Sequence, residues 1–258
     1  MEIDAYEHGV PSWVDVSTTN PAQVAEFFSA LFGWTCPEGD PDLGGYRSCS
    51  LDGRSVAGVT GLMSPDVPPS WATYINVDDA DAIAALVASH GGRVIAPVMD
   101  VADLGRMAIF SDPVGAVFGI WQPRLHKGAE VVNEPGAVVW NELMTTDTKA
   151  AAEFYTAVFG WTATVNDPDG PMPYTEFKVG DRSIAGMLAK PATLPADVPP
   201  NWLVYFAVSN LDATLTEVAR LGGSVLQPEV DMEYGRFAVI ADPTGAAVGV
   251  IQMPSESD

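Results

Sequence analysis

Hydrophobic and polar residues alternate along the chain with two different periods. Residues 13–17 (Trp-Val-Asp-Val-Ser) alternate with a period of two, as in a half-buried strand. Asn20-Pro21 then predicts a helix start, because Asn caps a helix and Pro suits its first position. Apolar residues at helical spacing follow, and Gly33 ends the helix. Strand-like runs at 45–51 and 55–62 are joined by the turn residues Asp52-Gly53.

The same order of elements then starts again. A strand is predicted over 71–77, and a helix from Asp79 to the pair Gly91-Gly92. Further strands are predicted near 93–98, 106–111 and 116–122, and Asp112-Pro-Val-Gly115 forms a tight turn before the last one. The unit is strand, helix and three strands, and one half of the chain holds two of them.

The second half of the chain repeats the first. Residues 13–34 align with 140–161 at ten identical positions out of 22, and both segments end in Phe-Gly-Trp. Three later motifs return in the same order, namely Arg54-Ser-Val-Ala-Gly58 at 182–186, Pro68-Pro-Ser-Trp71 at 199–202 and Asp112-Pro-Val-Gly115 at 242–245. A duplication of this kind predicts two similar domains. We expect them at 1–125 and 137–254, with a linker at 126–136 and a tail at 255–258.

Composition narrows the class of protein. Hydrophobic residues make up 47% of the 258, which suffices for a packed core, and the net charge is −22. Such acidity argues against nucleic acid and anionic membranes as partners. The amino-terminal residues lack a basic and apolar leader pattern, and no apolar run reaches the length of a membrane helix, so we expect a cytoplasmic protein. Two reduced thiols are expected for Cys36 and Cys49 rather than a disulfide.

The βαβββ order with these motifs resembles the vicinal oxygen chelate superfamily, which includes glyoxalase I, extradiol dioxygenases and bleomycin-resistance proteins. The resemblance covers nearly the whole chain and is closest to its two-domain actinobacterial members, some called 27-kDa antigens or hydroxylases. It implies an α+β fold of four βαβββ modules that form two glyoxalase/bleomycin-resistance-like domains. Each pair of modules would enclose a cavity, within or across the halves.

Catalytic members of this superfamily hold a divalent metal through His, Glu or Gln on the cavity-facing strands. The resemblance implies eight ligand positions in this chain, namely Trp13, Val59, Ala72, Gly119, Trp140, Met187, Leu203 and Gly249. None of these residues is a usual ligand for a divalent ion. The histidines His8, His90 and His126 fall outside the strands and are expected at the surface. The sequence therefore predicts neither a metal nor another cofactor.

Alternation along the strands indicates which side chains would face each cavity. In each half they are a Trp, a carboxylate and a Tyr: Trp13, Asp15 and Tyr74, and then Trp140, Glu142 and Tyr205. Arg106 and Arg236 precede inner strands and are expected to reach the carboxylates. We predict Asp15 and Glu142 as catalytic residues, and the Trp, Tyr and Arg residues as ligand-binding ones. An equally weighted alternative is structural, with a buried Asp15–Arg106 ion pair and Trp side chains that fill space.

The first functional hypothesis is a monomer or homodimer that binds a small hydrophobic or aromatic molecule in a metal-free cavity. The second is a metal-independent lyase, isomerase or hydroxylase-like tailoring enzyme that uses Asp15 or Glu142 as a base. Glyoxalase-like detoxification at an unusual site and an interaction protein are further alternatives. Ala72 in the first half corresponds to Leu203 in the second, and Trp121 corresponds to Ile251. Because these residues differ in size, the two cavities are not expected to be equivalent.

Overall fold

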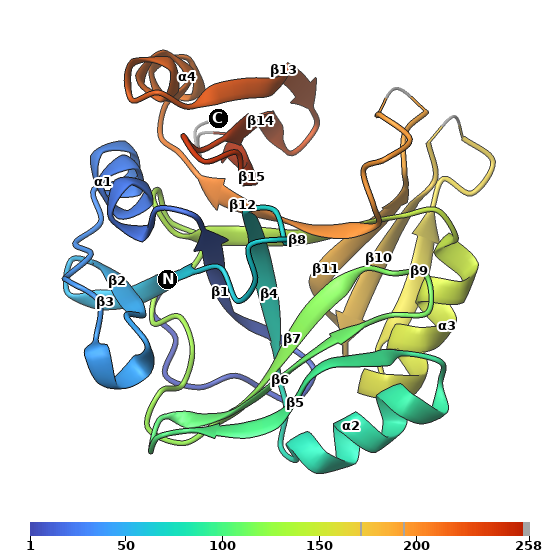
Figure 1. Cartoon of the computed structure of the whole chain (residues 1–258). Coiled ribbons are helices and arrows are strands. Elements are labelled where there is room, and N and C mark those ends of the chain that lie inside the picture. Colours follow the sequence, from blue (N-terminus) through green and yellow to red (C-terminus); the bar gives the residue numbers. More distant parts are fainter. Residues whose placement is uncertain (171, 193, 255–258) are drawn as a thin grey trace.

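The computed structural model describes residues 1–170, 172–192 and 194–254, so the expected tail at 255–258 lies outside the described residues. In the described residues the strands form one seven-stranded and one eight-stranded sheet. Each sheet draws its strands from one half of the chain (Figure 1).

The first sheet has the strand order β2-β3-β1-β4-β7-β6-β5. Its elements, with helices α1 and α2, are β1 (Pro11–Thr18), α1 (Pro21–Phe32), β2 (Arg47–Leu51), β3 (Arg54–Gly61), β4 (Ser70–Asn76), α2 (Ala80–Ser89), β5 (Arg93–Val101), β6 (Gly105–Ser111) and β7 (Val117–Pro123).

The second sheet has the order β13-β14-β15-β12-β8-β11-β10-β9. Its elements, with helices α3 and α4, are β8 (Val138–Thr145), α3 (Thr148–Phe159), β9 (Thr162–Asn166), β10 (Tyr174–Val179), β11 (Arg182–Ala189), β12 (Asn201–Ala207), α4 (Leu211–Arg220), β13 (Ser224–Met232), β14 (Gly235–Ala241) and β15 (Ala247–Gln252).

The α+β architecture of four βαβββ modules is confirmed, and modules pair within each half. The first strands of the two modules lie side by side and antiparallel at the centre of each sheet, β1 against β4 and β8 against β12. The expected caps explain where the helices begin and end. The Asn20 side chain accepts a hydrogen bond from the Gln23 amide, and Gly33 takes the left-handed conformation at φ 76°.

The first module departs from the repeat at one strand. The third module has β9 where the first has two isolated bridges, Thr35 with Ser50 and Asp40 with Tyr46. The residues after Thr35, Cys36 and Pro37, divert the chain, because Pro lacks the amide that a strand needs. Cys36 forms a disulfide with Cys49, so the prediction of two reduced thiols is wrong.

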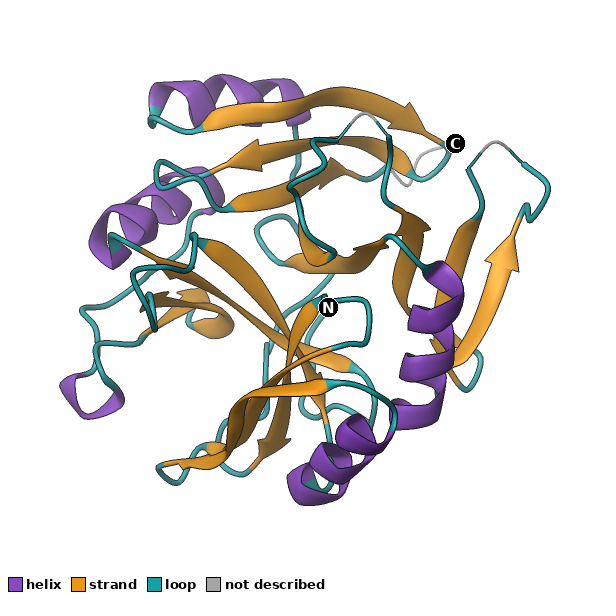
Figure 2. Ribbon diagram, turned by 45° about the vertical axis from the view of Figure 1, so that its right-hand side comes forward, coloured by secondary structure: helices purple, strands orange, loops and turns teal. Residues whose placement is uncertain are grey.

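The two halves pack through the faces of the sheets that carry the helices. One apolar cluster joins α1, β1 and β3 to α4 and the strands of the fourth module. A second joins α2 and the second module to α3 and the third module. Figure 2 shows the helices accordingly as two pairs, one at the upper left and one at the lower right. Both sheets therefore turn their other faces, here called the inner faces, away from this shared core.

Among the described residues, no helix is long and apolar enough to cross a membrane.

Candidate functional site

The inner face of the first sheet holds three of the predicted site residues. The Trp13 indole Nε1 donates a hydrogen bond to the Tyr46 hydroxyl at 2.7 Å. The hydroxyl of Tyr46 donates to Asp15 Oδ2 at 3.2 Å, and that of Tyr74 donates to Asp15 Oδ1 at 3.4 Å. One carboxylate therefore accepts from two phenols, and one phenol accepts from the indole.

The inner face of the second sheet carries the same arrangement. The Trp140 Nε1 donates to the Tyr174 hydroxyl at 2.8 Å. Tyr174 donates to Glu142 Oε2 at 3.0 Å, and Tyr205 donates to Glu142 Oε1 at 3.0 Å. We call Trp13, Asp15, Tyr46 and Tyr74 the first quartet, and Trp140, Glu142, Tyr174 and Tyr205 the second quartet.

The sequence prediction missed one tyrosine of each quartet, Tyr46 and Tyr174. A signal was present, because both tyrosines stand twelve residues before the glycine that ends the repeated Arg-Ser-x-Ala-Gly motif, Gly58 or Gly186. That glycine is needed for a close approach. A Cβ atom would lie 1.8 Å from the Tyr46 hydroxyl at Gly58 and 1.7 Å from the Tyr174 hydroxyl at Gly186.

Glycine also makes room for the other tyrosine of each quartet. A Cβ atom at Gly119 would lie 2.3 Å from the Tyr74 ring, and one at Gly249 would lie 2.2 Å from the Tyr205 ring. These two glycines stand at positions where the resemblance implied metal ligands. The phenol rings thus occupy space next to the strand that a larger ligand side chain would need.

Burial changes the acid–base properties of both carboxylates. Desolvation raises the pKa of Asp15 to about 7, although the hydrogen bonds from Tyr74 and Tyr46 oppose it. Desolvation also raises the pKa of Glu142, against the hydrogen bonds from Tyr174 and Tyr205. Each carboxyl can therefore exchange a proton nearer to neutral pH than an ordinary side chain of its type.

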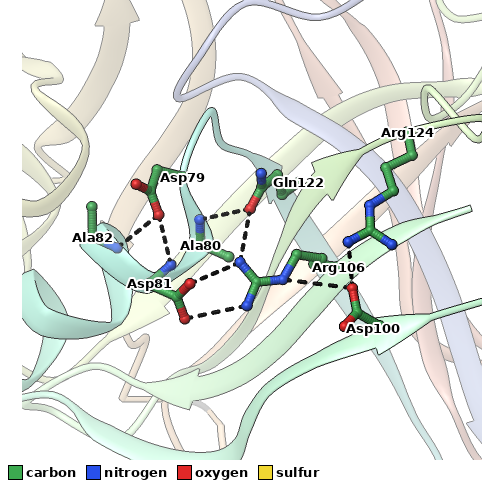
Figure 3. A network of polar contacts seen from close by, with 8 residues as sticks. All are labelled: Asp79, Ala80, Asp81, Ala82, Asp100, Arg106, Gln122 and Arg124. Atoms are coloured by element: carbon green, nitrogen blue, oxygen red, sulfur yellow. Dashed lines mark hydrogen bonds and ion pairs between the residues drawn. The ribbon is translucent and has the colours of Figure 1, made fainter. Parts of the chain in front are cut away.

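The prediction that Arg106 and Arg236 reach the carboxylates is wrong, and so is the Asp15–Arg106 ion pair. Met107 and Ile109 of β6 lie in the apolar cluster of the inner face, so Arg106 projects to the side that carries the helices. There it pairs with Asp81 at 2.8 Å and with Asp100 at 3.7 Å (Figure 3).

Arg236 of β14 follows the same alternation and pairs with acidic residues on the side of the helices, namely Asp212, Glu229 and Asp231. Both arginines thus link a helix start to a strand and do not belong to either quartet.

The donor set of the inner faces does not fit the divalent metal of the superfamily. Each quartet offers one carboxylate, and its two neighbouring phenols donate their protons to that carboxylate instead of presenting free ligand atoms. Among the described residues, no three His, Cys, Asp or Glu side chains form a group that could hold a metal ion. Two expected positions, Val59 and Met187, face the helices, and the inner-face neighbours there are Gly58 and Gly186.

The two quartets differ in what covers them. Residues 126–132, here called the strap, lie over the first quartet and are fixed by backbone hydrogen bonds from Ala129 to Ser12 and from Glu130 to Ser55. The centroids of the His126 and Trp13 rings lie 4.4 Å apart, and the two rings meet edge-on. The backbone carbonyl of His126 accepts a hydrogen bond from the Trp121 indole. His126 is therefore half-buried and not the surface residue that the sequence suggested.

Exposure of the side chains reflects this cover. Trp13 is 6% exposed and Asp15 is 5% exposed, whereas Trp140 and Glu142 are only half-buried. A cavity of about 380 Å³ near the strap is lined by residues such as Leu104, Leu125 and Glu130, and no member of the first quartet borders it. The second quartet has half-buried apolar neighbours on its inner face, Phe237, Val239 and Ile251.

Known proteins resemble this chain along nearly its whole length. It is 40% identical over 253 residues to "Putative glyoxylase CFP32" of Mycobacterium tuberculosis, with 96% of each chain covered. It is 38% identical over 266 residues to the anthracycline biosynthesis protein DnrV of Streptomyces peucetius, covering 95% of this chain and 94% of that protein.

The solved structure of the 2,3-dioxygenase LapB from Pseudomonas has the same fold, with a TM-score of 0.66, 14% identity and coverage of 97% of this chain and 96% of that one. A family model also matches residues 137–250, which cover the second sheet except for the end of β15. The chain belongs to the Glyoxalase/Bleomycin resistance protein/Dioxygenase superfamily.

Proposed function

We propose that the protein binds a small planar aromatic molecule on the inner face of the second sheet without using a metal. The observation that carries the proposal is the second quartet. Its indole is partly exposed beside a half-buried carboxylate, whereas the equivalent indole of the first sheet lies beneath the strap.

The chemistry of this face suits a flat, largely apolar ligand. Trp140 supplies an indole, and the ring of Phe237 lies 5.9 Å from that of Tyr205 at an angle of 69°. Aromatic side chains in such offset or edge-on arrangements favour ring-shaped partners. Val239 and Ile251 extend the apolar surface on the adjoining strands. Glu142 would then be the polar group that orients the ligand.

The name of one relative supports the same class of ligand. DnrV carries anthracycline biosynthesis in its name, and anthracyclines contain fused planar rings. We extend this to the present chain only as a class, planar aromatic molecules, and name no individual compound.

The test is a titration with 2-methoxynaphthalene, which is planar and has no hydrogen-bond donor. Binding is followed by two-dimensional NMR of the wild type, Trp140→Ala and Trp13→Phe. We expect Trp140→Ala to weaken binding at least about tenfold, because the main ring contact is lost. Trp13→Phe keeps a ring beneath the strap and should bind as the wild type does. Equal binding by Trp140→Ala and the wild type would contradict the proposal.

A second candidate is an enzymatic function with Glu142 as general base, such as a lyase, an isomerase or a hydroxylase-like tailoring reaction. The half-buried carboxyl with a raised pKa favours it, since a base works best when its pKa is near the working pH. Glyoxalase-like detoxification belongs here too, because one relative carries glyoxylase in its name. A glyoxalase assay with and without nickel or zinc, on the wild type and Glu142→Gln, would show turnover that depends on Glu142 but not on the added metal.

We also propose that residues 1–125 and 137–254 act as two domains of unequal function. The connecting residues 126–136 would join them and would also close the first domain, because the strap lies within them.

A further inference from the structure

Every hydrogen-bond donor in the second quartet already donates its proton to another member of the quartet. Trp140 donates its N–H to Tyr174, and Tyr174 and Tyr205 each donate their only hydroxyl proton to Glu142. Burial, and then the charge of Glu142, raise the pKa of both tyrosines above the ordinary value, so both hydroxyls keep their protons at neutral pH. While Glu142 is ionised, a ligand can therefore receive no hydrogen bond from these four side chains without breaking an existing one.

The second quartet still has capacity to accept hydrogen bonds. Each oxygen of an ionised carboxylate can accept at least two hydrogen bonds, and each Glu142 oxygen accepts one from the quartet. On the same face, Glu176 pairs with Lys178 at 3.0 Å and accepts a hydrogen bond from the Ser183 hydroxyl, so these groups already have partners. Glu142 is thus an acceptor whose remaining lone pairs have no partner among the described residues.

We infer that the ligand of this face is a phenol, a planar aromatic molecule whose O–H group donates a hydrogen bond to Glu142. The inference rests on the proposed function and adds the polarity of the ligand to it. A phenol fits better than an ammonium ion, because an ammonium ion would have to lose its water among the half-buried Trp140, Phe237 and Ile251. A ligand that offers only acceptors, such as an ether or a quinone, would face the acceptor oxygens of Glu142.

The first quartet supports this interpretation, because it has the same direction of donation. Trp13 donates to Tyr46, and Tyr46 and Tyr74 donate to Asp15. Two copies with different carboxyl side chains have kept one arrangement of donors, and in both the carboxylate is the final acceptor.

The experiment compares 2-naphthol with 2-methoxynaphthalene, which differ only in the donor proton and one methyl group. Dissociation constants are measured at pH 8 by calorimetry and NMR titration. For the wild type we expect 2-naphthol to bind about tenfold more tightly, as one hydrogen bond to a charged acceptor provides. In Glu142→Gln this preference should fall below about threefold, because an amide presents a donor as well as an acceptor.

Two further variants separate the hydrogen bond from other effects. Tyr205→Phe frees a lone pair on Glu142, so the preference for 2-naphthol should stay the same or rise. If it falls there, Tyr205 donates to the ligand and the inference is overturned. Glu176→Gln removes a charge from the same face but leaves the quartet intact, and it should behave as the wild type does.

The remaining outcomes separate a failure of the inference from a failure of the proposed function. Equal binding of both naphthalenes, still weakened by Trp140→Ala, would leave the aromatic site standing and overturn the requirement for a donor. Tighter binding of the methyl ether would do the same. If neither compound bound, or if Trp140→Ala changed nothing, the proposed function would fail and the inference with it.

Discussion

The inner faces of the two sheets carry the same arrangement of side chains, but one face is covered and the other is partly exposed. Both present an indole, two phenols and a carboxylate in the same hydrogen-bonded order. The first is closed by the strap, and its Trp13 is 6% exposed, whereas the second leaves Trp140 half-buried. The difference teaches that the quartet by itself does not define a binding site. What covers the sheet decides whether a ligand can reach the carboxylate.

The largest expected effect comes from removing each indole. Trp13→Ala should lower the free energy of unfolding by about 3–5 kcal/mol, since it leaves a cavity among Trp121, His126 and Tyr74. Trp140→Ala should lower the free energy of unfolding by less than half of that amount, because the Trp140 side chain is already partly exposed to solvent. Denaturant unfolding followed by circular dichroism measures both. Equal losses would mean that the two faces are equally closed.

The next effect is a dependence of stability on pH that belongs to the first quartet. The pKa of Asp15 in the folded protein, about 7, lies above the ordinary value of 3.8, so the folded state binds this proton more tightly than the unfolded state does. Its stabilising effect is complete below pH 3.8 and is lost as pH rises to about 7, at up to about 1.4 kcal/mol for each pH unit.

Asp15→Asn should remove that part of the pH dependence, and unfolding curves at pH 5, 6, 7 and 8 would measure it. Asp66→Asn, in an exposed loop, is the matched control and should keep the wild-type profile. A profile for Asp15→Asn as steep as that of the wild type would assign the effect to other groups.

A smaller effect is expected from the glycines beneath the tyrosines. Gly119→Ala should cost about 1–3 kcal/mol, because the new methyl group would lie 2.3 Å from the enclosed Tyr74 ring. Gly249→Ala meets Tyr205 as closely, and the two tyrosines are equally buried at 7% exposure, so a similar loss of stability is expected and ligand affinity should fall as well. Thermal unfolding and the 2-naphthol titration test the pair.

The smallest effect concerns the strap. His126→Ala removes the edge-on contact with Trp13 and should cost about 0.5–1.5 kcal/mol. It should also make tryptophan fluorescence more sensitive to acrylamide, because part of the cover over Trp13 is lost. His90→Ala, at an exposed position, serves as the control. Unchanged quenching in His126→Ala would show that the backbone hydrogen bonds of the strap suffice to close the face.

Much of the fold could be predicted from the sequence, because its signals are local and repeated. Caps such as Asn20 and Gly33 and the duplicated turns define the helices and strands, and the duplication predicts two equivalent sheets. Cys36 and Cys49 were interpreted incorrectly, because their pairing depends on how Pro37 diverts the chain after α1, a geometry that spacing does not reveal.

The candidate site could be predicted only in part. Strand alternation correctly brought Trp13, Asp15 and Tyr74 together, since neighbouring strands present their side chains in register. The same rule, applied to β6, would have turned Arg106 away from Asp15, because Met107 and Ile109 face inward. The strap could not be predicted, because residues 126–132 follow no period and are placed by contacts with distant residues such as Ser12 and Ser55.

The shared core behind the two sheets has a consequence for how the molecule unfolds. Apolar side chains of α1 and α4 belong to one cluster, and those of α2 and α3 to another, so neither half can be released without exposing the core of its partner. The whole chain should therefore melt as one cooperative unit. A ligand bound to the second sheet would delay the loss of the first as well, and its affinity would be readable from a single transition.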